Sequence, residues 1–525
     1  MATLSRRDFL KSSALGAAGG VAGAMATSAA SGEVPPAASP AATSPGAAAA
    51  ASTPPAAATP SATYRFTREI PAEDGFDLVV AGGGPAGTVA AVCAARLGAK
   101  VLLLEATGCL GGMGTSGLVT AFDPMANGER MLAGGVMKEI VTAMHKRGFL
   151  APHVTEEFYA KRFHCWTPFR VEGYKLILDE LAAAAKVDVR FFTRVVEADA
   201  EASRGLVRGV VTHGVDGLRW VGARAFIDAT GDAFLAERAG AACREAGRDT
   251  PAAMPATLCS LFAGIDWARA AGPGATGPSK QQSLLEKAIA AGHFTQPDKH
   301  LPGLYRVGDT VGMLNGGHVF RMNAVNTRSL SDGMMLGRRL AQEYVAFYRQ
   351  YVPGCENAEL AITAALMGVR ESRRIVGEYE LTFDDYMARR QFPDQVGVFN
   401  KAVDIHPYDN SPAEFQRYYK EYHQTGRLKA GECYGIPYGI LVPRGWRNLW
   451  VAGRCNSSDV QVHGSIRVQP AAAMMGQAAG TAAVQSLATG QPACDLDTAS
   501  LVETLRGQGA YLPQGELSAK MTRKG

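Results

Sequence analysis

Three glycines and one glutamate have the spacing of a dinucleotide-binding site. Gly82, Gly84 and Gly87 follow the apolar run 76–81, and Glu105 ends a second apolar run about 20 residues later. Gly82 permits a tight turn, Gly84 lets the backbone approach a pyrophosphate, and Gly87 lets the following helix pack closely. Glu105 can accept hydrogen bonds from a ribose. This order of strand, turn, helix, strand and acid predicts a bound dinucleotide rather than an ordinary glycine turn.

A second glycine-rich loop, residues 111–117, lies shortly after Glu105. Its sequence, GGMGTSG, supplies amides and hydroxyls that can fold around another part of a long cofactor. The glycine fingerprint alone does not choose between NAD and FAD. An NAD domain usually enters its next helix without such a loop, so the loop favours FAD. The further contacts expected from these two loops are Pro85, Ala86, Gly111, Gly112, Met113, Thr115 and Ser116.

Charged residues outside the fingerprint are candidates for the chemical step. Flavin chemistry requires a group that moves a proton and cations that stabilise developing negative charge. On a strand, His406 would share a face with Asp404, whose carboxylate can set the imidazole tautomer. The alternative is an ion pair for each arginine and a structural position for each histidine. The other candidates are Arg370 and Arg373, in a segment expected to be helical with Arg374, and His463 and Arg467; His318 and Asn323 are weaker, and His145, His153 and His300 are interpreted as surface residues.

The elements that position these residues alternate between strands and helices, which predicts an α/β fold. After the fingerprint, we expect strands at 187–192, 209–212, 219–221, 225–228 and 448–452. A helix is expected from Pro470, and its small residues at 471–473, 476, 479 and 480 permit close packing. A long helix, Asp332–Tyr351, has apolar positions at Met335, Leu336, Leu340, Tyr344 and Phe347.

Six segments in this order resemble the bacterial FAD-dependent oxidoreductases that are distantly related to fumarate reductase and succinate dehydrogenase flavoproteins. They are the fingerprint ending at Glu105, 110–119, 225–241, 368–382, 403–409 and 448–483. The resemblance implies a bound FAD, redox chemistry and a Rossmann-like FAD-binding domain of the glutathione-reductase type. That domain would comprise 76–122, 187–241 and 445–490, with an inserted α+β substrate or cap domain at 123–186 and 242–444 and a tail at 491–525.

The resemblance also implies individual cofactor contacts. The backbone of Val195 would touch the adenine, and the helix from Pro470 would direct its N-terminus at the flavin pyrimidine edge. Relatives often place an aspartate after the strand's glycine, but Arg454 stands here, which leaves Asp459 as the ribityl contact. The remaining implied contacts are Thr230, Gly231, Asp232 and Gly453.

The N-terminus has the pattern of an export signal. Residues 5–11, SRRDFLK, match the twin-arginine motif, and a small-residue apolar run follows it. We therefore expect a signal peptide at 1–30, a periplasmic or exported protein, and an Ala/Pro-rich disordered linker at 31–62. The apolar run is too short to predict a stable membrane span.

Composition and cysteine spacing argue against nucleic-acid partners and against metal or haem cofactors. The formal net charge is only +4 over 525 residues, and basic residues do not cluster with aromatics, so nucleic-acid binding is not expected. None of the nine cysteines has C-x-x-C spacing. Iron–sulfur, structural zinc and c-type haem sites are therefore not expected, and no metal site is predicted.

The expected function is an exported FAD-dependent dehydrogenase or reductase that transfers a hydride between a small organic substrate and flavin N5. No second GxGxxG on a strand–helix unit follows residue 117, so we expect the electron partner to be a cytochrome or quinone-linked periplasmic protein rather than NAD(P)H. Two alternatives stay open at this point. One is a flavin-dependent isomerase or lyase without net redox change, and the other is an electron-transfer subunit of a larger complex.

Overall fold

Parallel strands that bury apolar residues on both faces form the centre of the fold. The computed structural model describes residues 63–161, 166–270 and 278–513, and those from Arg68 onward belong to one unit. The strand order is β5-β2-β1-β8-β7-β6, and β19 also pairs with β8. The strands are β1 (Ala72–Ala81), β2 (Val101–Leu104), β5 (Asp188–Arg190), β6 (Arg194–Glu201), β7 (Leu206–Gly214), β8 (Gly217–Asp228) and β19 (Leu449–Val451).

The pairing directions divide this sheet into two parts. β5, β2, β1, β8 and β19 are mutually parallel, whereas β7 and β6 add an antiparallel extension after β8. The two strands expected at 219–221 and 225–228 are one continuous strand, β8. An α/β fold with a Rossmann-like parallel core is confirmed.

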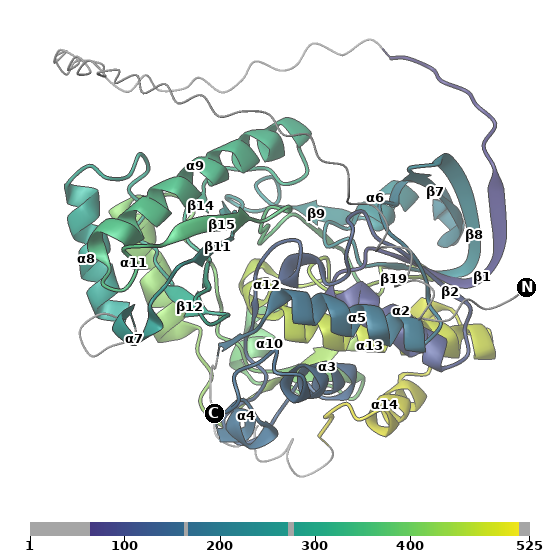
Figure 1. Cartoon of the computed structure of the whole chain (residues 1–525). Coiled ribbons are helices and arrows are strands. Elements are labelled where there is room, and N and C mark those ends of the chain that lie inside the picture. The colour runs from purple at the N-terminus through teal and green to yellow at the C-terminus, as the bar shows by residue number, and fades with distance from the viewer. Residues whose placement is uncertain (1–62, 162–165, 271–277, 514–525) are drawn as a thin grey trace, which may run out of the picture. The chain divides into compact units, whose positions relative to one another are not determined.

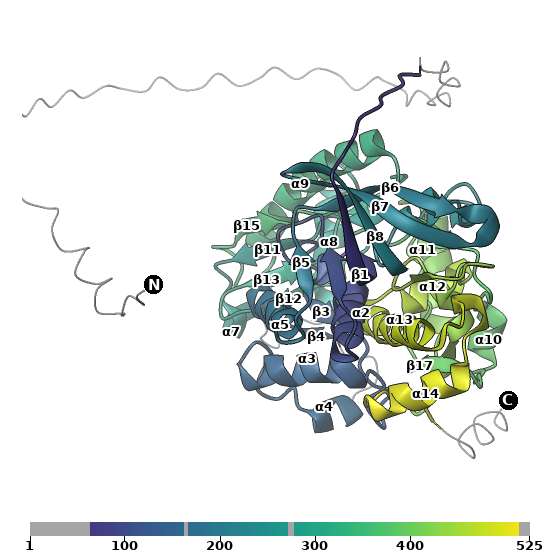
Figure 2. The same ribbon diagram turned by 90° about the vertical axis from the view of Figure 1, so that its right-hand side faces the viewer.

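Two helices made largely of small residues lie against the sheet with their backbones in contact. They are α2 (Pro85–Arg96) and α13 (Gln469–Thr489), which run side by side in both views (Figures 1 and 2). A Cβ on Gly476 would lie 2.1 Å from the Ala86 carbonyl oxygen, and one on Gly480 would lie 2.3 Å from that of Ala90. The expectation that small residues allow close approach of the helix beginning near Pro470 is therefore confirmed.

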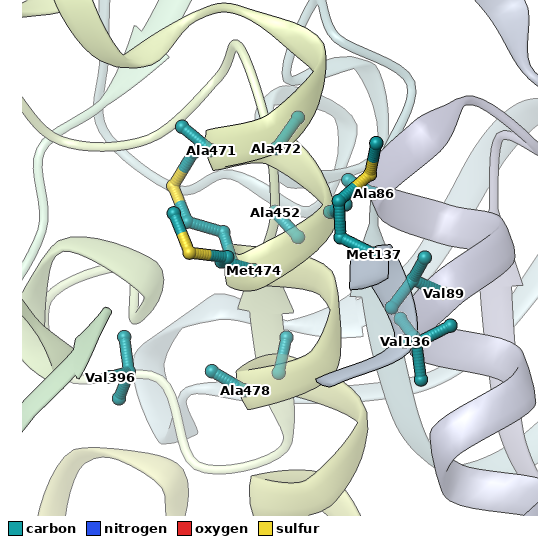
Figure 3. Packing of buried hydrophobic residues seen from close by; sticks show 14 of the residues in the cluster. Ala86, Val89, Val136, Met137, Val396, Ala452, Ala471, Ala472, Met474 and Ala478 are labelled. Atoms are coloured by element: carbon teal, nitrogen blue, oxygen red, sulfur yellow. The ribbon is translucent and has the colours of Figure 1, made fainter. Parts of the chain in front are cut away.

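Figure 3 shows how α13 fills the space between neighbouring elements. Its side chains at Ala471, Ala472, Met474 and Ala478 lie between α2 and α3 (Gly135–Lys146) on one side and β17 (Gln395–Phe399) on the other. α5 (Val171–Ala184) also packs on α2. The segment 123–186, expected in the cap, thus contributes two helices to the layer that covers the cofactor sheet. The tail contributes α14 (Thr498–Gly507), which packs on α13.

A second region carries the four-stranded antiparallel sheet β12-β13-β11-β15 and its helices, away from β7 and β8 (Figure 1). Helices α8 and α9 pack on it through Phe262, Leu285, Tyr344, Phe347 and Tyr348. The predicted long helix is confirmed as α9, but Met335, placed in its core stripe, is 58% exposed. The bounds are β11 (Ser260–Ala263), β12 (Leu304–Arg306), β13 (Gly312–Leu314), β15 (Glu359–Thr363), α7 (Trp267–Ala270), α8 (Pro278–Ala290), α9 (Thr327–Tyr351) and α11 (Pro412–Tyr419).

Short strand pairs and helices connect the two regions. The pairs are β3 (Ala121–Phe122) with β4 (Thr167–Pro168), β9 (Cys243–Glu245) with β16 (Arg373–Ile375), β10 (Ala256–Thr257) with β14 (His318–Val319), and β17 with β18 (Tyr434–Pro437). The remaining helices are α4 (Glu156–Lys161), α6 (Phe234–Ala239), α10 (Phe383–Met387) and α12 (Val460–Ile466). The predicted signal peptide and linker, residues 1–62, lie outside the described residues.

Gly87→Ala is expected to destabilise the protein by about 1–3 kcal/mol, because overpacking forces the backbone to move. An added Cβ would lie 1.8 Å from the Gly82 carbonyl oxygen and 2.9 Å from the Ala229 Cβ. Denaturant unfolding of the FAD-free protein measures the change. Gly507→Ala, where an added Cβ meets no atom within 4 Å, is the control. Equal stability of the two variants would contradict the close packing of α2 on the glycine turn.

Candidate functional site

The carboxyl ends of four parallel strands bring distant residues to one edge of the sheet. Ala81 of β1 is in register with Leu104 of β2 and with Asp228 of β8, and Val451 of β19 is also in register with Asp228. The segments that follow these strands therefore meet, as expected for a ligand site in a parallel α/β sheet. A cavity of 1740 Å³ opens at this edge and continues into the cap region. Small-molecule sites usually occupy about 300–1,000 Å³, so this cavity can hold a long cofactor and a second molecule.

The glycine turn at one end of the cavity fits a phosphate group. Gly82 has φ +97°, which a side chain disfavours, and its N–H donates to the Leu104 carbonyl at 2.8 Å. Gly84, Pro85 and Ala86 line the cavity at the N-terminus of α2. A Cβ on Gly84 would meet no atom within 4 Å, although Gly84 lies in a crowded turn. The open space above its backbone and the helix N-terminus suit a pyrophosphate.

Glu105 is held rigidly at the end of β2. Its Oε2 accepts from the Gly83 N–H at 2.8 Å, and its Oε1 accepts from the N–H and hydroxyl of Thr107, both at 2.7 Å. The residue is only 6% exposed, but it lines the cavity. A carboxylate has about four acceptor sites, so Glu105 retains capacity for a ribose hydroxyl.

Two further turns complete this part of the cavity. Asp228 is fully buried and accepts from Thr230 and from the Ala236 N–H, which fixes the turn after β8. Arg454, after β19, donates to the Gly231 carbonyl at 2.8 Å and pairs with Asp232 at 2.5 Å. In addition to the glycine turn and Glu105, the following expected cofactor residues line the cavity: Gly112, Met113, Val195, Thr230, Gly231, Asp232, Gly453 and Arg454.

Other expected cofactor residues do not line the cavity. Asp459, expected at the ribityl chain, is instead the N-cap of α12, where it accepts from the N–H groups of Val462 at 2.8 Å and Phe383 at 2.5 Å. Thr115 is 1% exposed and donates to the Leu110 carbonyl at 2.6 Å, so its hydroxyl holds the loop together. Gly111 and Ser116 do not line the cavity either, and neither does Gly87, whose role is packing.

The expected catalytic residues separate into two groups. Arg370, His406 and Arg467 line the cavity, whereas Arg373 and His463 do not. Arg373 pairs with Glu245 at 3.5 Å. His463 is fully buried, and its Nε2 lies 3.1 Å from the Arg370 carbonyl, so it supports the Arg370 loop.

The predicted helix at 370–374 is wrong. Residues 370–372 are irregular, and β16 begins at Arg373 because its backbone pairs with β9. In this irregular segment Arg370 lines the cavity, and Arg374 of β16 forms a buried pair with Glu371 at 2.6 Å.

Arg370 presents a buried positive charge to the cavity. Its guanidinium donates to the Pro255 carbonyl at 2.7 Å and to the Thr257 hydroxyl at 2.9 Å, and the residue is 5% exposed. Within the described part of the chain its hydrogen bonds go to neutral oxygens, and it takes part in no ion pair. Burial, and then the nearby Arg467, lower its pKa to about 10, so the group stays charged at neutral pH. The charge of Asp404 acts on it from a distance, so an anion that pairs directly with the guanidinium would compensate it further.

Asp404 connects three polar residues near Arg370. His406 Nε2 lies 3.3 Å from one carboxylate oxygen, and Arg467 and Lys401 lie 3.3 and 3.8 Å from the other. Burial opposes ionisation of Asp404, but His406, Lys401 and Arg467 hold its pKa well below the usual value. Burial and the charge of Arg370 lower the pKa of His406 well below its usual value. The strand expected at 404–406 is irregular, although the predicted contact between Asp404 and His406 is present.

His300 and Lys401 were missed as residues of the cavity. His300, interpreted as a surface residue, lines the cavity with His406. Both histidines end a D-x-H pattern, Asp298–His300 and Asp404–His406. This shared pattern is the sequence feature that could have identified His300 as a residue of the cavity. Lys401 is 3% exposed in its side chain and pairs with Asp123 at 2.5 Å. Nothing in its local sequence indicates burial.

A parallel sheet with a glycine turn and a long cavity at its carboxyl edge defines a dinucleotide-binding α/β enzyme. The chain belongs to the FAD dependent oxidoreductase family, whose sequence model matches residues 77–505. It is accordingly an FAD-dependent oxidoreductase, and the predicted cofactor is confirmed. The narrower relation to fumarate reductase and succinate dehydrogenase flavoproteins stays a prediction.

Individual relatives share less with this chain. It is 30% identical over 193 residues to digeranylgeranylglycerophospholipid reductase 2 of Methanopyrus kandleri, a match covering 35% of this chain and 43% of that protein's length. A geranylgeranyl bacteriochlorophyll reductase-like structure from Thermoplasma acidophilum matches with 14% identity and a TM-score of 0.41, covering 83% of this chain and 84% of the other. The flavin-dependent brominase Bmp2 matches with 13% identity and a TM-score of 0.41, covering 82% and 83%. Among the described residues, no helix has the length and hydrophobicity to cross a membrane.

Proposed function

We propose that this enzyme transfers a hydride between its flavin and a small organic anion that binds Arg370. The observation that carries this proposal is the buried Arg370 charge at the cap end of the cavity. Its hydrogen bonds within the described residues go only to neutral oxygens. A substrate carboxylate or similar anion would form a direct ion pair with the guanidinium and accept two parallel N–H bonds.

When bound, FAD supplies a hydride acceptor or donor at flavin N5. The chain's residues supply the remaining functions. Gln469 and Ala472 place the N-terminal turn of α13 on the cavity, where the helix dipole favours negative charge. The accompanying proton is exchanged at the cap end, where His406 lines the same space. Room for a substrate beside the cofactor favours catalysis over the alternative of an electron-transfer subunit.

The electron partner in this proposal is a cytochrome or quinone-linked protein rather than NAD(P)H, and the enzyme works after export. The presence of one strand–turn–helix glycine fingerprint, at 82–87, supports the first point, and the twin-arginine pattern supports the second. Anaerobic titration of the FAD-loaded enzyme tests the reaction. We expect stoichiometric bleaching, or re-oxidation of photoreduced flavin, by members of a panel of organic acids but not by their methyl esters. Reduction by NADPH alone, or turnover without net flavin reduction, would overturn the proposal.

Arg370→Gln is expected to weaken binding of the responding acid by roughly tenfold to 150-fold, because a hydrogen bond to a charged group contributes about 1.5–3 kcal/mol. The concentration dependence of flavin reduction gives this affinity. Arg373→Gln, a nearby arginine that does not line the cavity, is the matched control and should leave the affinity unchanged. Equal effects of the two substitutions would show that Arg370 does not bind the anion.

A further inference from the structure

Three histidines converge where the cap meets the cavity. His300 precedes β12, His318 begins β14, and His406 lies before α11. One ring nitrogen of each lies within 4.8 Å of the others. His300 and His406 line the cavity, and His318 is fully buried behind them. The cluster is separate from the glycine turn and from Glu105.

A carboxylate lies beside each of two of these rings. His318 Nδ1 lies 3.1 Å from Asp298, and His406 Nε2 lies 3.3 Å from Asp404. The other nitrogens, His318 Nε2 and His406 Nδ1, therefore face each other at 2.9 Å. Asp298 is itself fixed, since it accepts from the backbone N–H groups of His300 at 2.9 Å and His318 at 3.0 Å. A carboxylate behind each imidazole is the usual arrangement around metal-binding histidines.

The proton count also favours a cation between the rings. The chain Asp298–His318–His406–Asp404 has three contacts, and each needs one proton if it is to be a hydrogen bond. Two neutral imidazoles carry only two N–H groups. Neutral imidazole is the form that binds metal ions. A metal ion between the rings would let each N–H point to its own carboxylate.

We propose that His300, His318 and His406 bind one divalent first-row transition metal ion of the zinc and iron class. Imidazole suits these metals. Tetrahedral bonds of about 2.1 Å separate ligand atoms by roughly 3.4 Å, so the His318–His406 pair must open slightly and His300 must approach. Three protein ligands leave one coordination position open in a tetrahedral site. This position would face the cavity, because His300 and His406 line it.

The role of this ion rests on the proposed function, whereas its binding does not. In the open position, the metal would polarise a substrate oxygen or lower the pKa of a bound water. That water, rather than the bare His406 ring, would then exchange the substrate proton. Arg370 lines the same cavity as His300 and His406, so it would hold the substrate anion in the space that the open coordination position faces.

Metal loading of the FAD-containing protein tests the site. After removal of metals with a chelator, Zn²⁺ is titrated by calorimetry, and zinc and FAD are counted in the same sample. We expect one tightly bound zinc ion per chain, and Co²⁺ should give tetrahedral absorption bands beyond the flavin spectrum. Asp298→Asn should weaken binding by about tenfold to 100-fold, and His300→Ala by at least as much. Because His300 is partly exposed, its variant tests the site even if the buried Asp298 variant does not fold.

His213→Ala, at an exposed histidine on β7, is the control and should retain full zinc binding. Folded protein that contains FAD but binds no stoichiometric zinc would overturn the metal site and leave the proposed function intact. Zinc binding that is equal in the wild type and in His300→Ala would also overturn it. One zinc ion per chain without any response to organic acids would instead retain the site and overturn the proposed function.

Discussion

Gly84→Val is expected to fold normally and to lose its FAD. The backbone at Gly84 has φ −66° and ψ −175°, which any residue adopts, and an added Cβ meets no atom within 4 Å. The free space next to Gly84 is part of the cavity, where the pyrophosphate must approach the backbone. A valine therefore costs the empty protein little but excludes the cofactor. We expect the affinity for FAD to fall by on the order of 1,000-fold, equivalent to about 4 kcal/mol.

Calorimetric titration of the FAD-free protein measures this loss, with thermal unfolding as the check on folding. Gly507→Val is the matched control, since its Cβ also meets no atom within 4 Å but the residue lies at the exposed end of α14. The control should bind FAD as the wild type does. Stoichiometric FAD in Gly84→Val would show that the pyrophosphate does not lie on this turn.

Glu371→Gln is expected to destabilise the protein by about 3–5 kcal/mol, because it leaves the buried Arg374 charge without its partner. The two side chains are 0% and 2% exposed and lie 2.6 Å apart. They connect the Arg370 loop to β16, so the loss should also loosen the cap end of the cavity. Denaturant unfolding of the FAD-free protein gives the change in free energy.

Two comparisons make this prediction specific. Replacing both residues, Glu371→Met with Arg374→Met, should cost less than Glu371→Gln alone, because no buried charge is then left unpaired. Glu139→Gln removes the partner of Arg96 in a pair whose side chains are 44% and 40% exposed. Exposed pairs contribute about 0–1 kcal/mol. A loss at Glu371 no larger than the loss at Glu139 would contradict the buried pair.

The nucleotide-binding part of the fold could be predicted because its signals are local. Gly82, Gly84, Gly87 and Glu105 lie in one stretch, and the conformation of each follows from its neighbours in sequence. The small residues of α13 were equally informative, since only close helix packing explains so many in one helix. The cofactor and the family could be predicted from these elements only together with the second glycine-rich loop and the other segments of the resemblance.

The cap end of the site could not be predicted in the same way. The sequence predicts a helix at Arg370, but Arg373 pairs with distant β9 and residues 370–372 are irregular. The sequence predicts His300 at the surface, but its ring contacts those of His318 and His406. These two residues lie far away in sequence, so the contacts could not be predicted. Asp459 lies near the cofactor strand in sequence, but it caps α12. Contacts between residues distant in sequence determine the conformation and burial of these residues, and such contacts cannot be predicted from local patterns in one sequence.

The flavin content of the purified full-length protein tests most directly whether segments after β1, β2, β8 and β19 form one FAD site. Absorbance of the denatured protein counts free and attached flavin together. We predict one FAD per chain, retained through gel filtration. Correctly folded protein that is colourless and takes up no added FAD would contradict the proposed site.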